Sequence, residues 1–287
     1  MYKALADAIK DAEREKKSLA HMALTTEARD QGRPVEEIRA ALQRALDVMR
    51  GAIEKGLVGD LYSASGLVGG DAAKLRTSEK GPLAQTPFRD ILTRALAVQE
   101  VNAAMGVIVA APTAGGAGVL PAILTGLAKA RSVPDEKVVD GLATAGLIGA
   151  VVAERASLSG AEGGCQAETG AAAGMAAGAA TEMLGGTPSQ VGHAVALTMQ
   201  GTLGLVCDPL GGLVELPCVF RNATGAAIAL AGITFAIPVD EVIDVMGEIG
   251  REMDVRYRET AGGGLAATPT GRRLAKERLY QIKRSDG

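Results

Sequence analysis

Three cysteines, Cys165, Cys207 and Cys218, are the residues of this chain whose type and surroundings could do chemistry. Cys165 follows two glycines and precedes a helix-forming run. A thiol at a helix N-terminus favours the thiolate, which is the form that binds metal. Cys207 opens a Cys-Asp-Pro turn, and Cys218 directly follows a proline. All three are therefore expected in loops, whereas a core thiol would sit at a periodic apolar position of a helix.

The spacing of these cysteines leaves several kinds of site open. An odd cysteine count argues against a disulfide framework, and three unremarkable buried thiols are one alternative. Compact iron–sulfur sequences place cysteines every few residues, and this chain does not. A structural zinc site closes with four ligands, which only His21 or His193 could complete. Three thiolates on a cubane cluster would leave one iron open as a Lewis acid for a hydroxyl and a carboxylate.

Composition excludes some classes of function. The chain has 287 residues, a formal net charge of -3 and only 2% aromatic residues, so neither a basic face nor base-stacking rings are expected for nucleic acid. The uncharged run 101–128 is long enough for a membrane span. Prolines and glycines crowd its middle, which favours a buried helix, a Gly-rich loop and a second buried helix. The N-terminus reaches charged residues quickly, without a signal-peptide core, so we expect a cytoplasmic protein with no membrane partner.

Helices must position the cysteines, because apolar residues recur at helical spacing and no alternating strand pattern of any length is found. The fold class expected is all-α: a Gly/Ala-rich helical domain with ligand-bearing loops. One domain spans 1–287, within which 1–57 could form a semi-detached helical cap. The helices are predicted at 2–22, 35–55, 87–111, 121–131, 135–154, 166–184, 188–203, 222–236 and 238–253, with a loop at 61–75 and a short basic helix near the end.

Six segments carry a family pattern. Three surround the cysteines: Gly163-Gly164-Cys165-Gln166-Ala167-Glu168, Gly204-Leu205-Val206-Cys207-Asp208-Pro209, and Pro217-Cys218 with Arg221-Asn222. The others are Ser65-Gly66-Leu67 with Gly69-Gly70-Asp71, Ala111-Pro112-Thr113-Ala114-Gly115, and Gly264-Leu265-Ala266-Ala267-Thr268-Pro269-Thr270-Gly271. Together they closely resemble the α-chain of iron–sulfur-dependent L-serine dehydratase. The resemblance covers nearly the whole chain.

The resemblance implies a 4Fe–4S cluster on Cys165, Cys207 and Cys218, and conversion of L-serine to pyruvate and ammonia without pyridoxal phosphate. Some members of the family are fused to a β-domain, so a separate β-subunit is the expected partner here. Some fused relatives end in a cysteine that can approach the cluster, whereas this chain ends in 285–287 without one. Phe220 and Gly211 depart from the residues that the family pattern leads us to expect.

Further residues are candidates for binding substrate or moving a proton. Ser65 and Thr113 lie in Gly-flanked loops that could present hydroxyl and N–H groups to a carboxylate, or could serve as turns and caps. Arg221 could pair with a substrate carboxylate or tie down the Cys218 loop. Asn222 could cap a helix or donate to cluster sulfur. His193 is a candidate base on a helix, and the β-subunit is an alternative source.

Three other functions fit parts of the pattern. The nearest is iron–sulfur-dependent removal of sulfide from L-cysteine, or action on another small hydroxy acid. A pyridoxal-phosphate dehydratase would use 262–264 as a phosphate loop, but that loop lacks a βα context. A non-catalytic subunit could use a labile cluster to sense oxygen.

Overall fold

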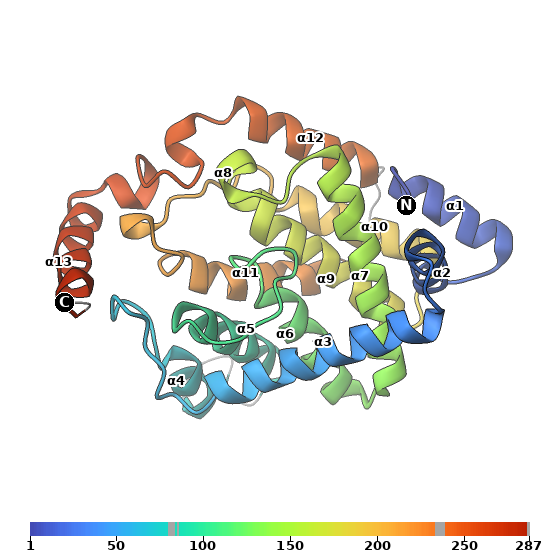
Figure 1. Cartoon of the computed structure of the whole chain (residues 1–287), viewed down its shortest axis with the longest axis horizontal. Coiled ribbons are helices and arrows are strands. Elements are labelled where there is room, and N and C mark those ends of the chain that lie inside the picture. The colour runs from blue at the N-terminus through green and yellow to red at the C-terminus, as the bar shows by residue number, and fades with distance from the viewer. Residues whose placement is uncertain (80–83, 85, 233–238, 286–287) are drawn as a thin grey trace.

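The chain folds almost entirely into helices, as its periodicity predicts. The computed structural model describes residues 1–79, 84, 86–232 and 239–285, which form thirteen α-helices, short 3₁₀ and π turns, and two isolated β-bridges. This confirms the all-α prediction (Figure 1). The helices are α1 (Leu5–Glu15), α2 (Leu19–Gln31), α3 (Val35–Gly56), α4 (Asp71–Thr77), α5 (Pro87–Ala103), α6 (Val119–Arg131), α7 (Asp135–Arg155), α8 (Gly160–Gly163), α9 (Ala171–Met183), α10 (Pro188–Gln200), α11 (Cys218–Ala231), α12 (Val239–Glu252) and α13 (Pro269–Ser285).

Some predicted boundaries are wrong, for local reasons. The helix expected at 2–22 is two helices, because Lys16 takes a left-handed conformation (φ 54°) and Ser18 caps the next helix by accepting from the N–H of His21 at 3.2 Å. The predicted loop at 61–75 includes the start of α4. Helix α11 starts at Cys218, four residues early, and the end of the predicted 222–236 helix lies outside the described residues.

Helix α9 forms the centre of the core. Nearly all of its residues are buried, and most are Ala or Gly. Helices α6, α7, α10 and α11 pack around it (Figure 1). Small side chains let helix backbones approach closely: a Cβ on Gly141 of α7 would lie only 2.8 Å from the carbonyl oxygen of Ala179 in α9. This packing holds α9, and the turn that precedes it, in a fixed place.

The N-terminal helices share this core. Leu5, Leu19 and Leu46 are fully buried within the same apolar cluster as α9. Asp240 of α12 accepts from the backbone N–H groups of Leu5 and Ala6, both at 2.8 Å, at the start of α1. These contacts join the beginning of the chain to its last third. The division of the chain into domains stays a prediction.

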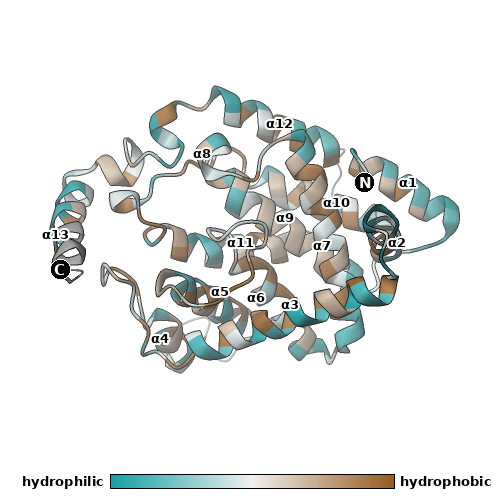
Figure 2. Cartoon of the chain, viewed as in Figure 1, coloured by the Kyte–Doolittle hydropathy of each residue, from teal (hydrophilic) through white to brown (hydrophobic). Residues whose placement is uncertain are grey.

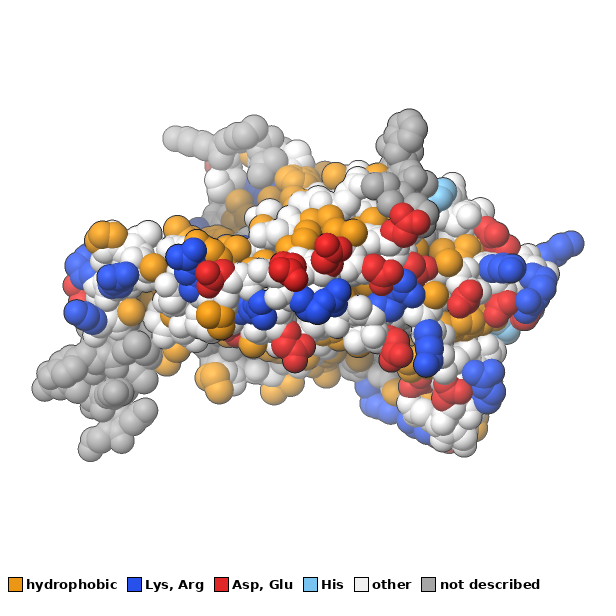
Figure 3. All heavy atoms as spheres, turned by 90° about the horizontal axis from the view of Figure 1, so that it is seen from above, with side chains coloured by type: hydrophobic (Ala, Val, Ile, Leu, Met, Phe, Trp, Pro, Cys, Tyr) orange, Lys and Arg blue, Asp and Glu red, His pale blue; other side chains and the backbone are white. Residues whose placement is uncertain are grey.

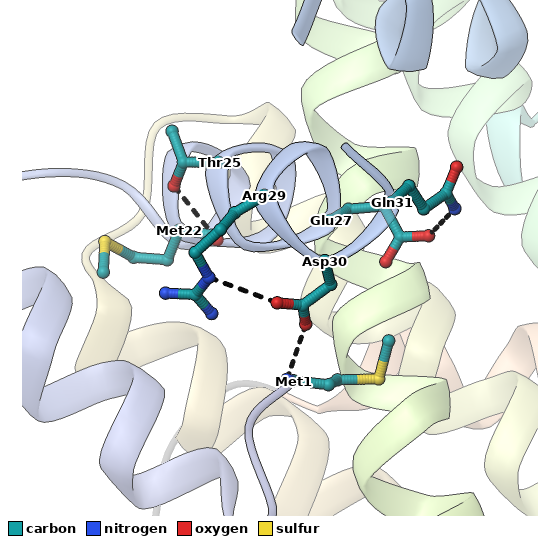
Figure 4. A network of polar contacts seen from close by, with 7 residues as sticks. All are labelled: Met1, Met22, Thr25, Glu27, Arg29, Asp30 and Gln31. Carbon is teal, nitrogen blue, oxygen red and sulfur yellow. Dashed lines mark hydrogen bonds and ion pairs between the residues drawn. The ribbon is translucent and has the colours of Figure 1, made fainter. Parts of the chain in front are cut away.

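The N-terminal amine is also held (Figure 4). The amine of Met1 contacts Asp30 at 2.6 Å, and Arg29 donates to the same carboxylate at 3.1 Å. In the same turns of α2, Thr25 donates to the Met22 carbonyl. The first residues therefore lie against α2.

The C-terminal part of helix α3 packs against α5 through a glycine. Replacing Gly56 with alanine is expected to lower the free energy of unfolding by about 1–3 kcal/mol, because the new Cβ would overlap the carbonyl group of Ala97. Gly51 on the same helix is exposed, with nothing within 4 Å of an added Cβ. Gly51→Ala should therefore raise the unfolding free energy by about 0.5–1 kcal/mol. Denaturant unfolding followed by circular dichroism measures both, and equal changes would contradict the close α3–α5 contact.

The outer faces of the helices are polar. Figure 2 shows hydrophilic residues along the outer sides of α3 and α12 and hydrophobic ones toward α5 and α6. On the α12 side, acidic and basic side chains are interspersed rather than gathered by sign (Figure 3). None of the helices in the described part of the chain has both the length and the apolar character needed to cross a membrane.

Candidate metal centre

Cys165 sits at a tight entry to α9. Gly164 before it has φ 73°, in the left-handed region, and a Cβ there would lie 2.8 Å from the Leu205 carbonyl oxygen. After it, residues 166–170 form a π-helical turn that continues into α9, a feature often found at functional sites. Gln166 ties this entry to a second loop, because its N–H donates to Leu205 at 3.1 Å and its Oε1 accepts from Gly204 at 2.9 Å. The Cys165 turn and the loop that carries Cys207 are thus one unit.

Cys207 is held from its other side by the segment after α12. Its N–H donates to the Tyr257 carbonyl at 2.7 Å, and the N–H of Glu259 donates to the Cys207 carbonyl at 3.0 Å. Its neighbour Asp208 accepts from the N–H of Leu265 at 2.8 Å. The backbone around this thiol is therefore fixed by residues about fifty positions further along the chain.

Cys218 is the first residue of α11, and all three cysteines are free and buried. The exposed fractions of Cys165, Cys207 and Cys218 are 3%, 1% and 5%. Burial raises the pKa of Cys218 to about 12, and the negative charge of Cys165 adds to this rise. Burial also raises the pKa of Cys207 strongly, followed by the charges of Cys218 and Cys165. Thiols that raise one another's pKa in this way lie close together.

This donor set fits a metal group. Three buried thiolates repel one another, and a bound cation offsets that repulsion and deprotonates the thiols. Burial raises the pKa of Cys165 as well, and the positive charge of Arg221 is the largest influence that lowers it. If the three thiols were ionised, the single positive charge of Arg221 would not balance their three negative charges. A cationic cluster or ion held by the three sulfurs would supply the rest.

Arg221 contacts the residues on both sides of Cys207. Its guanidinium donates to the Val206 carbonyl at 2.8 Å and forms a 2.7 Å ion pair with Asp208. The alternative role expected for Arg221 was to tie down the Cys218 loop, whereas these contacts hold the residues on either side of Cys207. Its neighbour Phe220 points outward, with 43% of its surface exposed. Gly211 has φ 65°, a conformation that explains a glycine where the family pattern has alanine.

Asn222 is fully buried and joins three segments. Its Oδ1 accepts from the N–H of Gly118 at 2.9 Å and from Gln99 at 3.3 Å. Its Nδ2 donates to the carbonyls of Gly115 at 2.7 Å and Cys218 at 2.9 Å. The side chain therefore fixes the turn at 112–118 against the helix that begins with a cysteine. It is neither the predicted N-cap nor, in these contacts, a donor to sulfur.

Replacing Asn222 with alanine is expected to lower the free energy of unfolding by about 2–6 kcal/mol, because two buried backbone groups lose partners at about 1–3 kcal/mol each. Denaturant unfolding measures the change. Asn102→Ala is the matched control: it also bonds the Gly-rich turn but is only partly buried, so a loss below about 1 kcal/mol is expected. Equal losses for the two variants would contradict this role for Asn222.

Ser65 and Thr113 each pair with an acidic residue. The hydroxyl of Ser65, 2% exposed, donates to Glu215, and Ser63 donates to the same carboxylate oxygen at 2.7 Å. Thr113 donates to Glu168 at 2.6 Å. Sequence reasoning missed both carboxylates as site residues. The position of Glu168, in the same motif as Cys165 and one helical turn after it, was the signal that could have found it.

Glu168 lies beside the cysteines together with Glu259. Carboxylate oxygens of both and the Sγ of Cys207 are all within 4.8 Å of one another. Burial raises the pKa of Glu168, while its hydrogen bond from Thr113 lowers it and the nearby Glu259 charge raises it. Two carboxylates therefore lie beside the Cys207 thiol.

His193 lies apart from these residues. It is exposed on α10 and lines a surface pocket of about 550 Å³ with residues of α6, α9 and α11. No cysteine and neither Glu168 nor Glu259 is among the described residues that line this pocket. His21 is exposed on α2. The structure therefore brings together the cysteines, Thr113, Arg221 and Asn222, but not His193.

Comparison with known proteins supports an enzymatic site. The family model described as "Serine dehydratase alpha chain" matches residues 13–266. The chain is 52% identical over 255 residues to a probable L-serine dehydratase alpha chain of Bacillus subtilis (84% of this chain, 83% of the relative). It is 42% identical over 257 residues to an L-serine dehydratase alpha chain of Peptoniphilus asaccharolyticus (86% and 87%). An L-serine dehydratase of Streptomyces coelicolor is 42% identical over 262 residues, which cover 86% of this chain but 57% of the relative. The chain therefore belongs to the serine dehydratase alpha chain family and is an enzyme, a lyase.

Proposed function

We propose that this chain is the α-subunit of an iron–sulfur-dependent L-serine dehydratase, which converts L-serine to pyruvate and ammonia. The observation that carries the proposal is the meeting of three buried, free thiols from distant segments beside one guanidinium and two carboxylates. A non-catalytic thiol core would not need charged groups around it.

Cys165, Cys207 and Cys218 would hold a 4Fe–4S cluster. Such a cluster, when bound by three cysteines, supplies an iron with an open position that acts as a Lewis acid on the leaving hydroxyl. The chain's own part is to keep the three sulfurs in place through the contacts of Arg221 and Asn222. The surrounding burial keeps bulk water away and so strengthens each charge in the site.

Glu168 would bind the α-ammonium group of L-serine. Its carboxylate is oriented by Thr113, and glycines at 115 and 160 leave room around it, because a Cβ at either would lie within 2.8 Å of a Glu168 oxygen. A carboxylate beside the ammonium group and a metal beside the hydroxyl would orient the substrate for loss of the α-proton and the hydroxyl. The elements of water leave, the resulting enamine becomes an imine, and water hydrolyses it to pyruvate and ammonia.

The base that takes the α-proton would come from a partner. Both histidines of this chain are exposed, and His193 lines a different pocket. The alpha-chain names of two relatives support a separate β-subunit. The Streptomyces coelicolor relative, named L-serine dehydratase, is longer than the stretch that it shares with this chain. We place the assembly in the cytoplasm, where free thiols stay reduced.

Anaerobic co-expression with a β-chain tests the proposal. We expect the purified assembly to contain iron and sulfide in equal amounts, near four of each per α-chain, and to release pyruvate from L-serine. L-Cysteine at the same concentration is the matched substrate and should release less pyruvate. An iron-free assembly that still consumes serine would contradict cluster chemistry, and faster release from cysteine would contradict the choice of substrate.

A further inference from the structure

A second donor set overlaps the three cysteines. Oxygens of Glu168 and Glu259 and the Sγ of Cys207 lie within 4.8 Å of one another, and Cys207 is 1% exposed. A thiolate and two carboxylates are all ligands of first-row metal ions. Glu168 already accepts a hydrogen bond from Thr113. Because Glu168 is the residue proposed to bind the substrate ammonium group, Glu259 is the carboxylate of this set that has no role in the proposed substrate site.

Glu259 stands next to Cys207 by its backbone. Its N–H donates to the Cys207 carbonyl at 3.0 Å, within the short bridge between residues 207 and 258. This hydrogen bond fixes the backbone of Glu259 beside Cys207. The carboxylate then reaches the space beside Gly160, where an added Cβ would lie 3.2 Å from its Oε2. Absence of a side chain at Gly160 leaves room for this approach.

The conformation of Glu259 argues for a role of its side chain. Its φ is 62°, in the left-handed region, which a long side chain rarely adopts and which costs of order 1–3 kcal/mol. Two residues later Ala261 also has a positive φ, of 54°, but its methyl side chain is far smaller than that of Glu259. The chain keeps a carboxylate where backbone conformation alone favours glycine.

We propose that Glu259 is a displaceable fourth ligand, whose carboxylate binds the iron left open by Cys165, Cys207 and Cys218 until the substrate replaces it. The inference rests on the proposed function, since it requires the cluster. The exchange involves no oxidation: one iron–oxygen bond to Glu259 breaks and one to substrate forms. A carboxylate suits this task better than a thiolate, which binds iron more tightly in a cluster.

Iron release to a ferrous chelator under anaerobic conditions tests the role without measuring turnover. Glu259→Gln and Glu259→Gly should each lose one iron per cluster at least about tenfold faster than the unchanged protein, because even partners of metal ligands are worth 10- to 100-fold in affinity. Glu259→Cys, which offers a thiolate, should lose it more slowly than the unchanged protein and should raise the KM for serine. Glu252→Gln, at the exposed end of α12, is the control and should match the unchanged protein.

The Glu259→Gly variant distinguishes the loss of an iron ligand from a loss of fold stability. It relieves the left-handed backbone at 259, so its thermal unfolding temperature should be equal or higher while its iron is lost faster. Iron release at the unchanged rate in both the glutamine and glycine variants would overturn the role of Glu259, even if cluster content and serine turnover were normal. An unchanged protein that binds no cluster would instead overturn the proposed function, and this inference with it.

Discussion

Replacing Cys207 with alanine is expected to remove the cluster and lower pyruvate formation from L-serine by more than about 100-fold. The loss should exceed the 10- to 100-fold cost of changing a residue that merely supports a metal ligand. Cys207 is the most buried of the three thiols, and its neighbours Val206 and Asp208 are both held by Arg221. The nearby carboxylates of Glu168 and Glu259 bind iron in a cluster less tightly than a thiolate does, so they should not restore the cluster. Iron and sulfide counts, the visible absorption spectrum and a pyruvate assay of the anaerobic assembly measure the change.

A change in packing could also lower activity, so a matched variant is needed. Val195→Ala removes buried volume from α10, in the apolar core, and should destabilise the fold by about 1–3 kcal/mol while keeping full iron and sulfide. Cys207→Ala should show the opposite metal content, because it loses iron and sulfide while Val195→Ala keeps both. Serine turnover that survives loss of the cluster would contradict the catalytic role and favour an oxygen-sensing subunit.

Replacing Glu168 with glutamine is expected to lower kcat/KM for L-serine by about 30-fold to several thousand-fold, with iron and sulfide unchanged. Glutamine keeps the size of the side chain and can still accept from Thr113, but it has no charge for the substrate ammonium group. Loss of one partner of a buried charge pair costs about 2–5 kcal/mol, and each 1.4 kcal/mol is tenfold. Steady-state kinetics of the anaerobic assembly measure the change.

Two controls isolate the charge of Glu168. Glu154→Gln removes an exposed carboxylate at the end of α7 and should leave kcat/KM unchanged. Thr113→Val keeps the carboxylate but removes the hydroxyl that orients it, so its loss should be smaller than that of the glutamine variant. If Glu168→Gln kept normal kcat/KM, the substrate ammonium would have to bind elsewhere.

Local signals in the sequence were enough to predict where most helices lie and to single out the three cysteines as candidate metal ligands. Helix periodicity, Gly and Pro near the loops, and the resemblance around Cys165, Cys207 and Cys218 depend on residues close in sequence. Where a boundary was wrong, a single local conformation decided it, as at Lys16. The cysteines converge inside the protein, as a shared site requires, because α9 and α11 pack together and the loop before α11 is held by Arg221.

Long-range contacts decided the roles of the other site residues, and no local pattern could show them. Thr113 meets Glu168 across 55 residues, and Ser65 meets Glu215 across 150. Asn222 reaches Gly118 across 104 residues. A buried hydroxyl or amide must find a hydrogen-bond partner, but which one it finds depends on which helices pack together. The three cysteines could thus be predicted as metal ligands from the sequence, whereas the carboxylates beside Cys207, Glu168 and Glu259, emerged only from the packing of the folded chain.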